Sequence, residues 1–290
     1  MIKMLALDDL TRTYTEVIGG GGFGIVKTGV GDPYDKFAVK FLYASQCPSA
    51  KKEFITNKFV YSAYEIFILN NPVKALSVVK PYNFTSSNCI VNCNADNYDC
   101  AVVMERLISP LDYAVHLAFN GVIHPSMMNK IIYVGNNPKN VPRGYFFGPE
   151  YVESMIKDQK IINKLEDITY RMGILDGISI FGARKIPIDV EYILTVGPDG
   201  YTVTMLDFGM FADININSDN YQEIAQNISD QQELNLYYHP HSDAIPLNNR
   251  QSCKDSYIQG FTEAFRAFDT NLYTKLYDAL IMIYVSDPVY

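Results

Sequence analysis

The chain lacks any long apolar run. Its longest apolar stretch, residues 279–285, is far shorter than the roughly 20 residues that a helix needs to cross a bilayer. Residues 1–9 lack the extended apolar core of a secretory signal peptide. We therefore expect a soluble and intracellular protein, most simply a cytoplasmic one, with no membrane partner.

Clustered positive charge is also missing. The chain has 24 Lys and Arg against 32 Asp and Glu, which gives a net charge of −8. Proteins that bind nucleic acid through its phosphates present basic patches instead. The composition therefore predicts no nucleic-acid partner.

Cysteine is scarce, and its pattern does not fit a zinc site. The chain has five cysteines, and neither a CxxC pair nor nearby histidines accompany Cys89, Cys93 and Cys100. We expect reduced structural thiols. The remaining balance, 48% hydrophobic and 19% charged over 290 residues, is that of a folded protein large enough for a small and a larger lobe.

Glycine is concentrated in one segment, residues 19–26, which has the pattern GxGxFGxV. Glycine at Gly19, Gly21 and Gly24 lets the backbone N–H groups of a strand-turn-strand loop approach phosphates, because a side chain there would block the approach. A dinucleotide-binding fold would follow its glycines with a helix. Here β-branched residues continue a strand-like pattern over residues 25–30.

The same loop supplies two further candidate ligand contacts. Phe23 at the tip would cap the phosphates against water, and Val26 would place an apolar face over an adenine ring. Lys40 follows Gly24 by sixteen residues at the end of the apolar run Phe37-Ala38-Val39. Its ammonium would pair with the α and β phosphates, with Ala38 among the lining residues.

Asp207, in the tripeptide Asp207-Phe208-Gly209, is the candidate magnesium ligand. It follows a predicted hairpin, with strands over residues 192–196 and 201–206. Glycine loop, strand lysine and this aspartate, in this order, are typical of a protein-kinase-like site that holds ATP and Mg²⁺.

A helix predicted over residues 54–69 carries the carboxylate that would fix Lys40. Glu65 is the favoured partner, and Glu53, close to the helix start, is the other candidate. The alternative is that Glu65 is an ordinary solvated helix residue.

Two predicted strands follow, over residues 76–82 and 100–104. In a kinase-like fold the second leads into the connection between the lobes. Met104 would then guard the back of the pocket, and backbone groups from Glu105 to Leu107 would meet the adenine edge.

The rest of the chain should be mainly helical. Apolar residues recur at helical spacing over residues 161–175, which predicts a buried helix, and over residues 258–272, which predicts another.

The catalytic loop of a protein kinase is missing. Where its histidine, arginine and aspartate are expected the sequence has Lys185-Ile186-Pro187, and Tyr192 replaces the asparagine that would hold a second metal. Asp189 and Glu191, on one face of an extended segment, are candidate substitutes as base or metal ligand. They could equally form ion pairs with neighbouring basic residues.

Two resemblances follow from these motifs. Residues 18–107 resemble the small lobe of a eukaryotic-type protein kinase. Residues 170–211, through Arg171-Met172-Gly173, the segment 188–194 and Met205-Leu206-Asp207-Phe208, are similar to a fungal kinase-like domain of unknown function that is often labelled zinc-finger-like. Residues 133–135 and 237–240 resemble it as well.

The resemblances imply a bilobal α+β kinase-like fold. Residues 1–107 would form a small antiparallel β-sheet lobe with one helix that binds nucleotide, and residues 108–290 a larger helical lobe. The predicted function is ATP binding with Mg²⁺, either in a divergent phosphotransferase with an unknown phosphoacceptor or in a pseudokinase. The alternative is a scaffold that binds a protein partner and is not an enzyme.

Overall fold

The computed structural model describes residues 6–21, 24–73, 75–86, 98–107, 134–135, 159–188, 190–197, 200–215, 220–232, 247–268 and 271–286. Contacts between Cα atoms divide the chain into two compact units. The first consists of Met1–Tyr61 and Val79–Ile108, and the second of Ser62–Val78 and Ser109–Tyr290. Helices and antiparallel sheets occur together, as the predicted α+β class requires.

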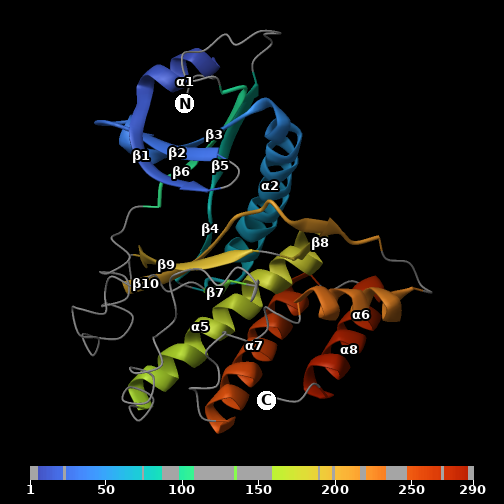
Figure 1. The fold of residues 1–290 in the computed structure, drawn as a ribbon. Coiled ribbons are helices and arrows are strands. Elements are labelled where there is room, and N and C mark those ends of the chain that lie inside the picture. Colours follow the sequence, from blue (N-terminus) through green and yellow to red (C-terminus); the bar gives the residue numbers. More distant parts are fainter. Residues whose placement is uncertain are drawn as a thin grey trace. The chain divides into compact units, whose positions relative to one another are not determined.

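The first unit is built on a five-stranded antiparallel sheet with the order β1-β2-β3-β6-β5 (Figure 1). Its strands are β1 (Tyr14–Gly21), β2 (Gly24–Gly29), β3 (Phe37–Leu42), β5 (Pro81–Ser86) and β6 (Cys100–Glu105). Helix α1 (Leu7–Thr13) precedes the sheet, and helix α2 (Cys47–Asn70) follows β3. The sequence predicted one helix here, so α1 is an addition to that prediction.

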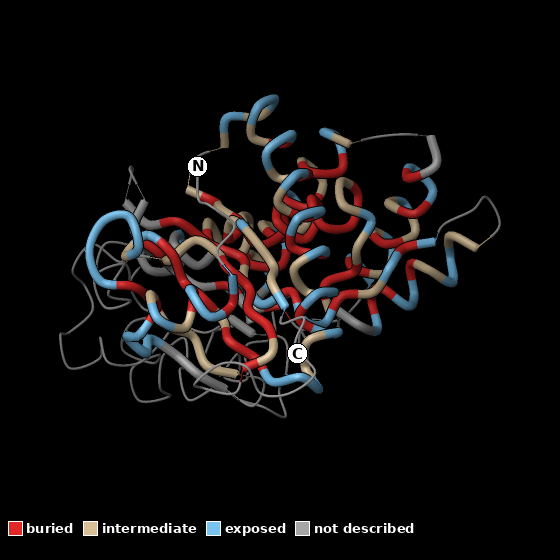
Figure 2. Tube along the Cα trace, turned by 90° about the horizontal axis from the view of Figure 1, so that it is seen from above, coloured by how far each residue is buried: buried red, intermediate tan, exposed pale blue. Residues whose placement is uncertain are grey.

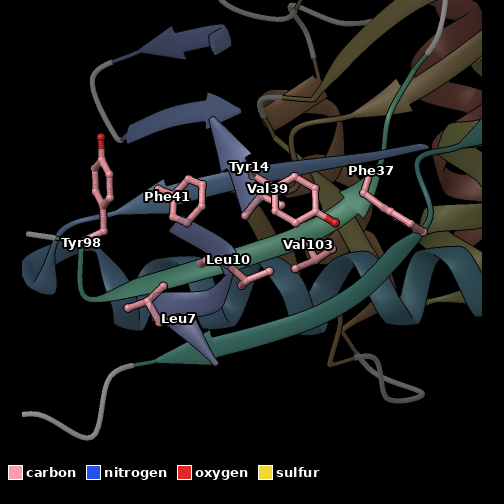
Figure 3. Packing of buried hydrophobic residues seen from close by; sticks show 9 residues of the cluster. Leu7, Leu10, Tyr14, Phe37, Val39, Phe41, Tyr98 and Val103 are labelled. Atoms are coloured by element: carbon pink, nitrogen blue, oxygen red, sulfur yellow. The ribbon is translucent and has the colours of Figure 1, made fainter. Parts of the chain in front are cut away.

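One face of this sheet packs against α1. Leu7 and Leu10 of the helix are buried together with Val39 and Phe41 of β3 and Val103 of β6 (Figure 3). Alternate residues of a strand point to opposite faces of the sheet, so the residues between them, including Lys40, point to the other face. Two aspartates lie in the first turn of α1, where their negative charge stabilises the helix by interacting with the positive end of its dipole.

The opposite face carries a second apolar cluster. Leu42, Cys100 and Val102 from the sheet are buried there with Ala50 of α2. Cys47, Phe54, Phe84 and Met104 pack against them. Lys40 therefore lies on the face of the sheet that α2 covers.

The second unit contains two small sheets and most of the helices. The sheets have the orders β4-β10-β9-β7 and β11-β8. The strands are β4 (Leu76–Val78), β7 (Val134–Gly135), β8 (Lys185–Pro187), β9 (Glu191–Gly197), β10 (Gly200–Leu206) and β11 (Phe211–Asp213). The helices are α5 (Gln159–Gly177) with a π-helical end (Ile178–Gly182), α6 (Tyr221–Gln232), α7 (Leu247–Phe268) and α8 (Asn271–Ser286).

Two predicted elements have different bounds in the structure. The strand predicted over residues 76–82 is divided, because β4 pairs in parallel with β10 whereas β5 pairs antiparallel with β6. A continuous apolar run does not reveal such a change of partner. The tail helix predicted over residues 258–272 is two helices, α7 and α8.

Helices α5 and α7 lie side by side and pack very closely (Figure 1). A Cβ atom added to Gly173 would lie 2.1 Å from the carbonyl oxygen of Tyr257, and one added to Gly260 would lie 1.9 Å from that of Tyr170. Only glycine fits at these two positions. Residues 172–181 form a continuous buried stretch. Figure 2 colours the buried residues of the described segments red. None of the described helices is long and apolar enough to span a bilayer.

Candidate functional site

Lys40 of β3 forms an ion pair with Glu53 of α2. The Lys40 Nζ atom lies 3.1 Å from Oε1 and 3.0 Å from Oε2 of Glu53, so the carboxylate holds the ammonium with both oxygens. The two side chains are only 18% and 14% exposed. An ammonium with three N–H groups retains capacity for a further acceptor in this arrangement. The pair therefore presents an oriented positive charge on the α2 face of the sheet.

The prediction that Lys40 pairs with Glu65 is wrong, and the alternative partner, Glu53, is the one in the structure. Glu65 lies twelve residues later in α2 and is exposed to solvent. The helix begins at Cys47, seven residues earlier than predicted from the apolar pattern, which began at Phe54. Glu53 is thus well inside the helix instead of at its edge.

Four residues of the sheet were predicted to line the nucleotide pocket, and they lie on one face of the sheet: Val26, Ala38, Lys40 and Met104. Val26 pairs with Lys40 between β2 and β3, and Ala38 pairs with Met104 between β3 and β6. Directly paired residues of antiparallel strands lie on the same side of a sheet. Ala38 is buried, while Val26 and Met104 are partly buried. The structure thus brings Val26, Ala38 and Met104 together around Lys40.

The glycine segment forms the hairpin of β1 and β2. Gly19 pairs with Val26 and Gly21 with Gly24, and Phe23 at the tip lies outside the described residues. A Cβ atom added to Gly24 would lie 2.3 Å from the carbonyl oxygen of Phe41. Gly24 is therefore required by the close approach of the backbone, whether or not a ligand binds.

The chain leaving β6 is already partly bonded. The Glu105 N–H donates to the carbonyl of Lys80 at 2.8 Å, and the Arg106 N–H donates to the carbonyl of Lys36 at 3.1 Å. These two amides are thus committed to the protein. The predicted contact with an adenine edge therefore falls to the carbonyl groups of this segment and to Leu107.

Arg106 also sends its side chain back to the sheet. Its Nη1 atom lies 3.4 Å from both Thr28 Oγ1 and the Asp35 carbonyl oxygen. Sequence reasoning gave a role to the backbone of this segment but none to the Arg106 side chain. Its position directly after the predicted pocket strand was the signal available for it.

Asp207 follows β10 directly and has an unusual backbone conformation. Its φ angle is 61°, in the left-handed region that few residues other than glycine adopt. The Gly209 N–H donates to Asp207 Oδ1 at 3.4 Å. Phe208 is buried and stacks on Phe211 with ring centroids 5.4 Å apart. The buried ring holds the turn while the Asp207 side chain is exposed, and strained aspartates of this kind occur at functional sites.

The segment that replaces the kinase catalytic loop is structured. Lys185, Ile186 and Pro187 form β8, which pairs with β11 directly after the Asp207 turn, and the Lys185 ammonium forms an ion pair with Asp213. Asp189 lies outside the described residues. The Glu191 backbone pairs with Leu206, but its side chain is likewise outside the description. Their assignment as substitute base or metal ligand stays a prediction.

Tyr192 belongs to a buried polar group that sequence reasoning missed. The hydroxyl groups of Tyr192 and Tyr257 both donate to the carboxyl group of Asp176, the second at 2.5 Å. Burial raises the pKa of Asp176 from 3.8 to about 7, although both hydrogen bonds act to lower it. An aspartate inside the apolar run Ile174-Leu175-Asp176-Gly177-Ile178 was the available sequence signal.

Two of the cysteines are not reduced thiols. Cys47 and Cys100 form a disulfide bond, so the expectation of reduced cysteines is wrong for this pair. They lie 53 residues apart in the sequence, and no sequence spacing indicated that the start of α2 meets the start of β6. Cys253 is a free, buried thiol. Within the described ranges, no group of three or more Cys, His, Asp and Glu residues could hold a metal.

Comparisons with known proteins give no family for the chain. No family model matches it, and no curated protein matches it. The predicted likeness to a fungal domain is therefore without support.

Three solved structures illustrate the distant likenesses that were found. A mutant of the Mycobacterium tuberculosis PknI kinase domain has a TM-score of 0.32 and 10% identity, covering 93% of this chain and 94% of its own. Vaccinia related kinase 3 has a TM-score of 0.33 and 9% sequence identity, and the match covers 93% of this chain and 86% of the kinase chain. The aminoglycoside phosphotransferase of Alicyclobacillus acidocaldarius has a TM-score of 0.24 and 11% sequence identity, and the match covers 98% of this chain and 92% of its own. At these TM-scores the likenesses carry no weight of their own, and fold and site rest on the strand order and contacts of this chain.

Proposed function

We propose that this chain binds ATP with Mg²⁺ on a bilobal kinase-like fold. The single observation that carries the proposal is the ion pair of Lys40 with Glu53 on the sheet face that also bears Val26, Ala38 and Met104. A largely buried lysine fixed by a helix carboxylate, next to a glycine hairpin, supplies the oriented charge that nucleotide phosphates need.

Each residue of the site has a part in this proposal. Lys40 binds the α and β phosphates, and the backbone of Gly19, Gly21 and Gly24 accommodates them. Val26 and Ala38 cover the adenine ring. Asp207, exposed and held in the left-handed region, chelates Mg²⁺. Bound ATP would supply a phosphoryl group that can be transferred.

Within this proposal we favour a pseudokinase over an active phosphotransferase. Tyr192 stands where a second metal ligand is expected, and its hydroxyl is buried against Asp176. Pro187, near the expected position of the catalytic base, is buried in β8. Loss of a general base alone reduces a rate by roughly 10²- to 10⁴-fold. If the chain does transfer phosphate, Asp189 or Glu191 would be the base, and Asp207→Asn should abolish turnover.

A scaffold that binds a protein partner is the second candidate. The close contact of Gly24 with Phe41 favours a scaffold, because this contact alone requires glycine at that position, without any ligand. Four large apolar side chains of α2 are also exposed, namely Ile55 at 42%, Phe59 at 54%, Ile66 at 53% and Leu69 at 84%. A scaffold has no evident use for the buried Lys40–Glu53 pair, so ATP binding remains the leading proposal.

Titration calorimetry with MgATP distinguishes the two candidates. We expect Lys40→Ala to weaken binding by about 10- to 100-fold, since a hydrogen bond to a charged group contributes about 1.5–3 kcal/mol. Glu53→Gln should weaken binding less, because it leaves the ammonium in place but poorly oriented. Glu65→Gln is the matched control on the same helix and should bind as the native chain does. Absence of heat at saturating MgATP, with the native fold verified by circular dichroism, would favour the scaffold.

A further inference from the structure

We propose that the Cys47–Cys100 disulfide is a redox switch that controls the Lys40–Glu53 pair and, through it, nucleotide affinity. The affinity part of this inference rests on the proposed ATP-binding function. The control of the ion pair does not, because both the bond and the ion pair are features of the described first unit.

The disulfide and the ion pair connect the same helix to the same face of the same sheet. Cys47 is the first residue of α2, and Glu53 follows it after less than two turns. Cys100 pairs in register with Leu42 of β3, two residues after Lys40. Residues two apart on a strand share a face. The bond thus fixes the start of α2 beside the strand that carries Lys40.

Noncovalent contacts also hold the start of the helix at this point. The cluster between helix and sheet has Leu42, Ala50, Cys100 and Val102 as its buried members, and Cys47 itself packs against them. The turn before α2 is also held by the Ala44 N–H, which donates to Asp99 Oδ2 at 3.0 Å. That hydrogen bond persists when the disulfide is reduced. We therefore expect reduction to loosen the first turns of α2 and not to unfold the helix.

The two sulfur atoms differ in accessibility, which determines how the bond is reduced. Cys100 is fully buried, whereas Cys47 is only partly buried. A thiolate of a dithiol reductant attacks Sγ of Cys47, the sulfur–sulfur bond breaks, and Cys100 leaves as a thiolate that takes up a proton. The second thiol of the reductant then closes the reductant's own disulfide and releases Cys47 as a thiol. Two electrons pass to the protein.

A disulfide of this kind can be regulatory if the protein resides in a reducing compartment. Intracellular disulfides of mesophilic proteins are mostly transient, catalytic or redox-sensing. The oxidised form would have Glu53 fixed against Lys40, and the reduced form would let the carboxylate move away. We expect the oxidised form to bind MgATP about tenfold more tightly, a coupling of ordinary size for two linked sites.

The test compares the oxidised chain with the chain reduced by dithiothreitol. Intact mass after thiol alkylation verifies the two states, since reduction adds two alkylated cysteines. Two properties are then measured: the rate at which an acylating reagent modifies Lys40, and the dissociation constant for MgATP. We expect reduction to raise the first and to weaken binding. The double variant Cys47→Ser/Cys100→Ser should match the reduced chain with or without dithiothreitol, and Cys253→Ser should respond as the native chain does.

The two measurements separate failure of the switch from failure of the proposed function. Equal Lys40 modification rates in the two states would overturn the switch. A changed modification rate with an unchanged MgATP dissociation constant would overturn its link to the site. A changed rate in a chain that binds no MgATP in either state would support control of the ion pair and refute the nucleotide function.

Discussion

Replacing Asp176 by Asn should remove a large pH dependence from the stability of this protein. The carboxyl group is fully buried, and burial raises its pKa in the folded state from 3.8 to about 7. The folded state therefore binds the proton more tightly than the unfolded state does. This tighter proton binding stabilises the folded state. The contribution is fully present below about pH 4, and it is lost as the pH rises through about 7.

The magnitude follows from the two pKa values. The folded and unfolded pKa values of Asp176 differ by about three, and each pKa unit corresponds to about 1.4 kcal/mol. The total effect on the free energy of unfolding is therefore about 4 kcal/mol. Most of the loss, about 2–3 kcal/mol, should fall between pH 5 and pH 8. Asparagine has nearly the same shape and no charge at any pH. The stability of Asp176→Asn relative to the native chain should therefore rise by that amount across this interval.

Urea unfolding at pH 5, 6, 7 and 8, followed by circular dichroism because the chain has no tryptophan, measures this difference directly. Tyr192→Phe is a companion variant. Its hydroxyl acts to lower the pKa of Asp176, so its removal should move the transition to higher pH. A stability difference that is constant with pH, or that falls as the pH rises, would refute the reasoning.

Two further predictions concern glycines at close backbone contacts. Gly260→Ala should destabilise the chain by about 2 kcal/mol or more, because the new Cβ would lie 1.9 Å from the Tyr170 carbonyl oxygen. The neighbouring exposed Gln259→Ala is the control, and equal melting temperatures of the two variants would contradict the prediction. Gly24→Ala should lower stability by about 1–3 kcal/mol even without nucleotide, since its Cβ would lie 2.3 Å from the Phe41 carbonyl oxygen. An effect seen only when ATP is present would assign that glycine to the ligand instead.

The strands that carry the candidate site residues could be predicted because their signals are local. The spacing from the glycines to Lys40, and the hairpin that ends at Asp207, depend on strand periodicity and turn residues. The structure places both as expected. The helix carboxylate that pairs with Lys40 was harder to predict, because an apolar pattern does not fix the residue at which a helix begins. The start of α2 at Cys47 decides in favour of Glu53.

The rest depends on contacts between distant segments. The disulfide joins residues 53 apart, and the Asp176 group unites α5, β9 and α7. No local pattern encodes such encounters. The division of residues 76–82 between two sheets has the same origin, because strand propensity is equal for either partner.

The most direct test of ATP and Mg²⁺ binding is the thermal shift that ATP produces with and without Mg²⁺, in the native chain, in Lys40→Ala and in Asp207→Asn. We expect stabilisation of the native chain that depends on Mg²⁺. Lys40→Ala should show a smaller ATP-dependent shift, as expected for its weaker binding, and Asp207→Asn should lose the dependence on Mg²⁺. No shift of the native chain at saturating MgATP, or an equal Mg²⁺-dependent shift in all three proteins, would contradict this account.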